Sequence, residues 1–140
     1  MRRLLSLILF FALSSGLALA DPPQPVKDLL RDAVNALSGD DASSFMDLID
    51  RSFKDYAALH EEIVGLLAKY EAGSNIVIVN DFGDDAKRTL DLDWLLTLHD
   101  KNDGSNPDQT RRQLIKCQVQ KQGKRWKIVS LQPLDFFRYN

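Results

Sequence analysis

The chain contains one cysteine, Cys117, and only two histidines, His60 and His99, among its 140 residues. One cysteine cannot close an internal disulfide, so packing alone must stabilise the fold. The position four residues after His60, where a zinc protease carries its second histidine, is occupied by Val64. We therefore predict no metal site and no other cofactor, and we interpret His99 as a surface residue.

The sequence also lacks the common motifs for phosphate, nucleotide and calcium binding. Neither Gly83 nor Gly123 belongs to a phosphate-cradling motif. The loop that begins at Asp100 has its glycine one position too early for a calcium loop, and Arg111 stands where such a loop places a bidentate glutamate. No set of acid and base groups can be assembled from the sequence, so we predict no catalytic residue.

Charged residues are absent from a long stretch near the start of the chain. Arg2 and Arg3 precede the apolar run Leu4 to Leu13, and Ala18-Leu19-Ala20 precedes Asp21. This pattern predicts a signal peptide over residues 1–20 and export to the periplasm or outside a bacterial cell. A membrane anchor is the weaker alternative, because the run is shorter than the ~20 residues that a spanning helix needs. We expect no stable membrane anchor after cleavage.

Acidic and basic residues are distributed unevenly over the rest of the chain. Residues 21–100 hold 17 acidic and 7 basic groups, whereas residues 101–140 hold 3 acidic and 9 basic groups. We expect Arg112, Lys116 and Lys127 to lie across the sheet from Asp91 and Asp93 as exposed pairs. A basic patch for an anionic partner is the alternative, but the overall acidic balance argues against nucleic acid.

The first half of the chain predicts helices. Residues 21–25 form a proline-rich lead-in that we expect to be flexible, and a single domain follows over residues 26–140. Apolar residues from Val26 to Leu37 recur at helical spacing and end before Gly39. A short second helix would present Phe45, Leu48 and Ile49, and a longer third helix would run from near Phe53 to Glu71, closed by Gly73 and Ser74.

The second half predicts strands. Leu90, Leu92, Trp94, Leu96 and Leu98 alternate with Thr89, Asp91, Asp93, Leu95, Thr97 and His99, so one side of this strand is buried and the other faces solvent. Further strands are expected over residues 76–79, 111–121 and 125–132, separated by turns over residues 80–85, 100–108 and 122–124. Short connections predict an antiparallel sheet, and helices that precede strands predict an α+β fold.

Two features have competing interpretations. Cys117 lies in an alternating strand, which favours a small core residue over a reactive thiol. The last residues, from Leu134 to Tyr139, are rich in aromatic side chains. We expect them to pack back over the core, whereas a homodimer or protein contact is the alternative, because aromatic anchors concentrate at interfaces.

Three passages resemble the nuclear transport factor two-like superfamily. They are Ala36-Leu37-Ser38-Gly39-Asp40 leading to Phe45, the approach from Asp84 to Trp94, and the closing passage from Gly123 to Val129. The resemblance implies three N-terminal helices packed on a curved four-stranded antiparallel sheet, a cone also similar to that of cystatins. Members usually have a hairpin between the second and third helices, which Ile49 to Phe53 is too short to form.

This resemblance does not select a function, because its relatives include ketosteroid isomerase, dehydratases, hydrolases and binding domains. We predict an exported non-enzymatic domain that binds a small apolar ligand or serves as a protein-interaction accessory. An enzyme of the isomerase, dehydratase or hydrolase type and a cystatin-like inhibitor or envelope-assembly partner are the alternatives. The candidate pocket-lining residues, taken from alternation and helix phase, are Tyr56, Tyr70, Trp94, Cys117, Trp126 and Ser130.

Overall fold

Three helices precede a four-stranded antiparallel sheet in the computed structural model, which describes residues 22–140. The elements are α1 (Gln24–Ser38), α2 (Ala42–Asp47), α3 (Tyr56–Lys69), β1 (Tyr70–Gly83), β2 (Lys87–Asp100), β3 (Gln109–Gln122), β4 (Arg125–Gln132) and the 3-10 helix η1 (Leu134–Phe137). This arrangement confirms the predicted α+β fold. The expected signal peptide and Asp21 lie outside the described residues.

Helix α1 begins at Gln24, two residues before the first residue of the predicted apolar stripe. A proline is tolerated in the first helical turn, where its missing N–H would have no partner, so Pro25 does not delay the helix. The stripe itself is confirmed, since Val26, Leu29 and Ala33 are buried. None of the helices in residues 22–140 combines the length and the hydrophobicity of a membrane-spanning segment.

Helix α2 is short and has a side-chain cap. Asp41 accepts a hydrogen bond from the backbone N–H of Ser44 at 2.9 Å and from its hydroxyl at 2.6 Å, and these bonds lower the pKa of the Asp41 carboxyl. Phe45 and Ile49 are buried, as the sequence predicts, and Leu48 is partly buried. The capping carboxylate therefore fixes the start of α2, and the apolar residues that follow contact the core.

The predicted boundary between α3 and β1 is wrong. The chain is extended from Tyr70 onward, with φ −127° and ψ 146° at this residue, so Gly73 and Ser74 lie inside β1. Tyr70 is buried and pairs with Asp100 of β2. The sequence obscured this switch because Tyr70 continues the helical spacing of α3, while the residues after it are small or polar.

The strands follow one another in the order β1-β2-β3-β4, and two bulges adjust which side chains face the helices. Val79 is the extra residue in β1, so β1 continues to Gly83 and the turn predicted over residues 80–85 is shorter than expected. Val129 is the extra residue in β4. Ser130 consequently pairs with the exposed Gln118, and Leu131 takes the buried position instead.

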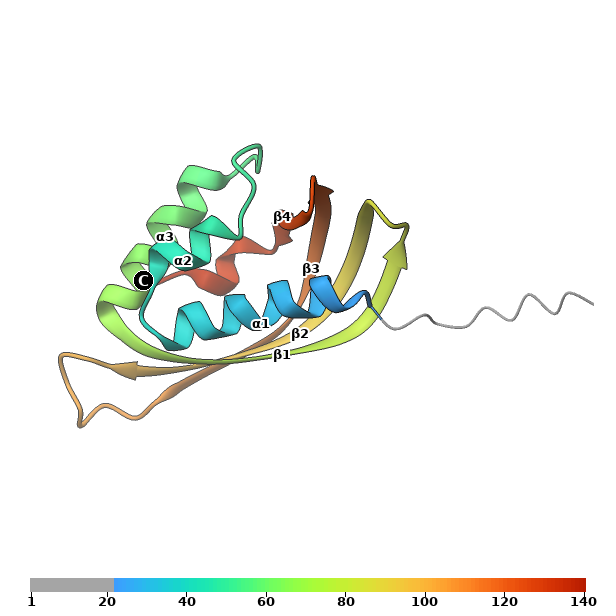
Figure 1. Ribbon diagram of the computed structural model, residues 1–140. Helices are drawn as coiled ribbons and strands as arrows, with labels where there is room; N and C mark the ends of the chain where they lie inside the picture. Colours follow the sequence, from blue (N-terminus) through green and yellow to red (C-terminus); the bar gives the residue numbers. More distant parts are fainter. Residues whose placement is uncertain (1–21) are drawn as a thin grey trace, which may run out of the picture.

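Helix α1 lies along the concave side of the curved sheet, and α2 and α3 group near one end of it (Figure 1). Between these helices and the sheet, Trp94 contacts Phe137 edge to face, with ring centroids 5.2 Å apart, and Phe136 at 5.9 Å. Both phenylalanines are buried. The C-terminal aromatic residues therefore pack over the core, as predicted, on the side of the sheet that faces the helices.

The segment between α2 and α3 is a short strand-like link, in place of the hairpin that the resemblance implies. Ile49 pairs with Ile128 of β4 as an isolated parallel bridge. The N–H of Asp50 donates to the Ile128 carbonyl at 2.8 Å, and the N–H of Ile128 donates to the Leu48 carbonyl at 2.9 Å. The segment between α2 and α3 is thus attached to the free side of β4.

Candidate binding groove between α1 and β1

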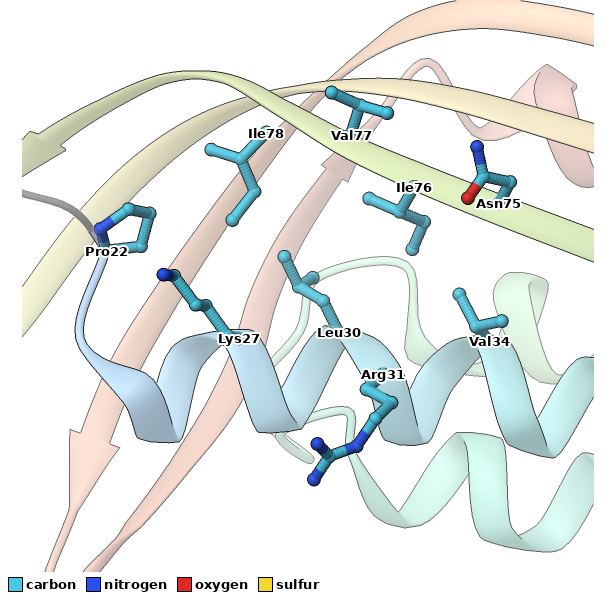
Figure 2. A pocket seen from close by; sticks show the side chains of 9 residues that line it. All are labelled: Pro22, Lys27, Leu30, Arg31, Val34, Asn75, Ile76, Val77 and Ile78. Atoms are coloured by element: carbon cyan, nitrogen blue, oxygen red, sulfur yellow. The ribbon is translucent and has the colours of Figure 1, made fainter.

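A groove of about 580 Å³ separates α1 from β1 (Figure 2). Its helical wall consists of side chains spaced at i, i+3, i+4 and i+7, which share one face of a helix. Its sheet wall consists of four consecutive strand residues, and Pro22 closes one end. The lining residues are Pro22, Lys27, Leu30, Arg31, Val34, Asn75, Ile76, Val77 and Ile78.

The floor of the groove is apolar. Leu30 and Val34 extend from α1 toward β1, and Ile76 and Ile78 extend from β1 toward α1 (Figure 2). Leu30 is buried, while Val34, Ile76 and Ile78 are only partly buried, so an occupant could remove further apolar surface from water. Such burial contributes roughly 25 cal/mol per Å², which favours an occupant with an apolar body.

The charged groups of the groove are both cationic. Lys27 extends toward Ile78 and Pro22, whereas the Arg31 guanidinium lies on the side of α1 away from β1 (Figure 2). Arg31 forms an ion pair with Asp28 at 3.0 Å, but no salt bridge to Lys27 occurs among the described residues. The groove therefore offers one cation, Lys27, to an anionic group at the end near Ile78.

The lining residues do not support acid–base or nucleophilic catalysis. They include no carboxylate, histidine, cysteine, serine or tyrosine, so a proton donor and acceptor cannot converge on a substrate there. The core between the helices and the sheet holds no carboxylate or histidine among the described residues, since its buried cluster consists of apolar and aromatic residues and Cys117. The arrangement can hold a ligand but supplies no evident reaction.

The structure does not bring the six predicted pocket residues together around the groove, and none of them lines it. Trp94, Cys117 and Tyr70 are buried in the core, and Trp126 is 8% exposed. Tyr56 lines a separate depression of about 250 Å³ beside Lys127. Ser130 lies on the opposite side of the sheet from the core because of the bulge at Val129.

Two of these core residues have specific local environments. The indole N–H of Trp94 donates to the hydroxyl of Ser74 at 2.8 Å, so its polar group is satisfied. Burial raises the pKa of the Cys117 thiol to about 12. Full burial of the side chain confirms the interpretation of Cys117 as a core residue, and a thiol that stays protonated is a poor nucleophile.

The polar face of β2 forms surface contacts. Arg112 binds Asp93 through two hydrogen bonds of 3.0 Å and 2.6 Å, which lower the pKa of the Asp93 carboxyl. Lys116 is the register partner of Asp91, as predicted, although Asp91 accepts its hydrogen bond from Asn80. The prediction for Lys127 is wrong, since its ammonium donates to the Asp47 carbonyl beyond the opposite edge of β3.

His99 lies on the same face of β2, at the end near the predicted loop. Its Nδ1 is 2.7 Å from the Asp108 carboxylate, and this contact raises the pKa of His99. Within residues 22–140, no group of three or more His, Cys, Asp or Glu side chains is placed to hold a metal ion.

The groove was missed by sequence reasoning for a physical reason. Its walls come from segments more than 40 residues apart, and its floor is the edge of the amphipathic stripe of α1 rather than the centre. One signal was available. The stretch Ala72 to Val79 contains no charged residue and no proline, which is unusual for a strand that ends up at the edge of a sheet.

Comparison with solved structures identifies the fold. A protein from Novosphingobium aromaticivorans provisionally named scytalone dehydratase is 14% identical, with 77% of this chain and 79% of that chain covered and a TM-score of 0.65. A nuclear transport factor 2 (NTF2-like) superfamily protein from Salmonella enterica serovar Typhimurium is 10% identical, covering 77% and 86%, with a TM-score of 0.61.

A third structure, from Streptomyces avermitilis and provisionally named a dehydratase of the NTF2-like family, is 10% identical over 77% of this chain and 92% of that chain, with a TM-score of 0.62. By sequence, no family model matches this chain and no curated protein is significantly similar to it. At these identities the comparisons establish a shared backbone architecture and no shared chemistry.

Proposed function

We propose that this chain, which has the cone-shaped fold of nuclear transport factor two-like proteins, is an exported binding domain without catalytic activity. Its ligand would occupy the groove between α1 and β1 through an apolar body. The observation that carries the proposal is the filled cone: Trp94, Phe136 and Phe137 occupy the hollow, and the accessible apolar volume lies outside it.

The dehydratase names among the structural neighbours suggest an enzyme as the rival function. Dehydration needs an acid and a base within reach of one substrate. Within the described residues, neither the groove nor the buried core holds such a pair. A cystatin-like inhibitor with an exposed aromatic end is also disfavoured, because Phe136 and Phe137 are buried.

The proposal of export rests on the N-terminal sequence. Arg2 and Arg3, the apolar run that follows and the site after Ala20 are typical of a cleaved secretory signal. Expression in a bacterial host should yield a periplasmic or secreted protein whose intact mass corresponds to a chain that begins at Asp21. Retention of residues 1–20 in a membrane fraction would contradict export as a free domain.

A thermal-shift screen of lipophilic ligands, followed by native mass spectrometry of the hits, tests the binding function. Val34→Trp would fill the groove from its helical side, and we expect it to weaken binding of a hit by at least about tenfold. Val64→Trp is the matched control, since Val64 is another partly exposed helical valine that does not line the groove. Absence of any hit would refute a small lipophilic ligand, and equal binding by both variants would refute the groove as its site.

A further inference from the structure

Strand β1 has an open edge. It is the first strand in the sheet order, and β2 is its only strand partner within residues 22–140. The other outer strand, β4, is different, because its free side is bridged to Ile49. An unpaired strand edge presents a row of N–H and C=O groups that can accept another strand.

Natural edge strands are normally protected from such pairing by charged side chains, prolines or bulges. The stretch Ala72 to Val79 of β1 has no charged residue and no proline. Its first flanking charge is Glu71, and the bulge falls at Val79, where the stretch ends. The middle of β1 is therefore unprotected over a length that suits a short extended peptide.

The groove runs along this edge. Successive strand side chains point to opposite faces, so four consecutive residues can line one groove only where the strand edge itself forms the wall. Asn75 to Ile78 line it in this way. Figure 2 shows Ile76 and Ile78 directed toward α1 while Val77 points away from it, so backbone and apolar side chains face the same space.

We propose that an extended peptide segment of a partner protein adds to the edge of β1 as a fifth strand of the sheet. Its alternate apolar side chains would fill the groove, and an acidic side chain at the same face would pair with Lys27. The inference rests on the proposed function, because it names the occupant of the same groove. Main-chain hydrogen bonds would give affinity, and the groove would select the side chains.

Charge distinguishes such a partner from a second copy of this chain. Lys27 extends into the groove near Ile78 without a salt bridge among the described residues, so it is available to a carboxylate. A second copy that offered its own β1 would bring no acidic residue from Ala72 to Val79, and the neighbouring Glu71 lies on the face of β1 opposite to the buried Tyr70 and the helices. The groove thus favours a segment with apolar residues at every second position and an acidic residue at one end.

The test uses the exported protein as purified and the capped peptide acetyl-Val-Thr-Val-Thr-Val-Thr-Glu-Thr-amide, together with the reversed sequence to cover both strand directions. Amide hydrogen exchange is measured by NMR. Alternate N–H groups of a strand point to the same edge. We therefore expect the amides between Ala72 and Val79 that point away from β2 to exchange at least about tenfold more slowly when the peptide is present. A peptide N-methylated at alternate residues should give no protection.

The variant Lys27→Glu, at an exposed position, tests the charge preference. This variant should no longer bind the glutamate peptide, and it should bind the same peptide with lysine in place of glutamate. If both proteins prefer the same peptide, the acidic specificity is wrong. If the amides of Ala72 to Val79 that point away from β2 are already protected in the peptide-free protein, a second copy covers the edge, and the inference is overturned.

Failure of this inference can be separated from failure of the proposed function. A lipophilic ligand that binds in the groove and is lost in Val34→Trp, with no alternating protection by any peptide, overturns the strand addition and leaves the binding function standing. Absence of both lipophilic binding and peptide protection overturns both.

Discussion

The ring of Tyr139 lies directly against the backbone of Gly65 in α3. A Cβ atom placed on Gly65 would come within 2.4 Å of Cδ1 of Tyr139, so only glycine permits this approach. The backbone N–H of Tyr139 donates to the Glu62 carboxylate at 3.2 Å, one turn earlier in the helix. Together these contacts fasten the C-terminal end of the chain to α3.

This contact predicts a reversal of sign for one substitution. In the wild-type chain, Gly65→Ala should lower the free energy of unfolding, because the methyl group displaces Tyr139. In a Tyr139→Ala background the clash is gone, and the same change should raise it by about 1 kcal/mol through helix propensity. Urea unfolding of the wild type, the two single variants and the double variant measures the coupling energy between the two positions. Equal effects of Gly65→Ala in both backgrounds would contradict the contact.

Filling of the cone predicts a large cost for Phe137→Ala. Phe137 is fully buried against Trp94, Phe45 and Phe136, so the substitution should cost about 3–5 kcal/mol and leave an apolar cavity. Such cavities can bind a small aromatic molecule, and benzene should restore part of the lost thermal stability. Phe82→Ala is the control, since Phe82 is 55% exposed and its loss should have little effect.

The ion pair between Arg88 and Asp81 predicts non-additive substitutions. Arg88 Nε lies 2.7 Å from Asp81 Oδ1, and the side chains are only 11% and 6% exposed. Arg88→Met should destabilise the protein by roughly 3 kcal/mol, because it leaves a buried carboxylate unpaired. Arg88→Met combined with Asp81→Leu should be less harmful than Arg88→Met alone. Denaturant titration of the single and double variants measures their free energies of unfolding. If the losses caused by the two single substitutions simply add in the double variant, the ion pair does not contribute as predicted.

His99 predicts a pH-dependent contribution. Its pKa is raised above 6.5 by the Asp108 carboxylate, so the contact stabilises the folded protein below that pH and is lost as pH rises through the folded-state pKa. NMR titration of His99 should give a midpoint above 6.5 that falls in Asp108→Asn and in high salt. A midpoint unchanged by Asp108→Asn would show that the contact does not persist in solution.

The sequence predicts most of the fold where one periodicity dominates. Leu90 to Leu98 alternate over the whole of β2, and every one of these inward residues is buried. The start of β1 was not predictable in this way, because Tyr70 satisfies both the helical and the extended pattern. The bulges at Val79 and Val129 were also missed. In a bulge two residues of one strand oppose one residue of its neighbour, and a single sequence does not show which residues of two strands pair.

The candidate groove was beyond local reasoning because it depends on where α1 crosses the sheet. Alternation predicts to which face of the sheet the Ile76 side chain points, but it does not distinguish an edge strand from a central one. Trp94 and Cys117 were proposed to line a pocket on the basis of the face they occupy. That face is occupied by Phe136 and Phe137, which approach from the far end of the chain.

The bridge between Ile49 and Ile128 has a consequence for assembly. It obstructs the edge of the sheet formed by β4 near the middle of that strand. Strand β1 is therefore the only continuous open edge among the described strands. Growth of a sheet from molecule to molecule requires two available margins on each unit. Pairing through β1 would therefore join only one partner to each molecule and could not continue into a fibre. One edge of the sheet stays available for a strand of a partner.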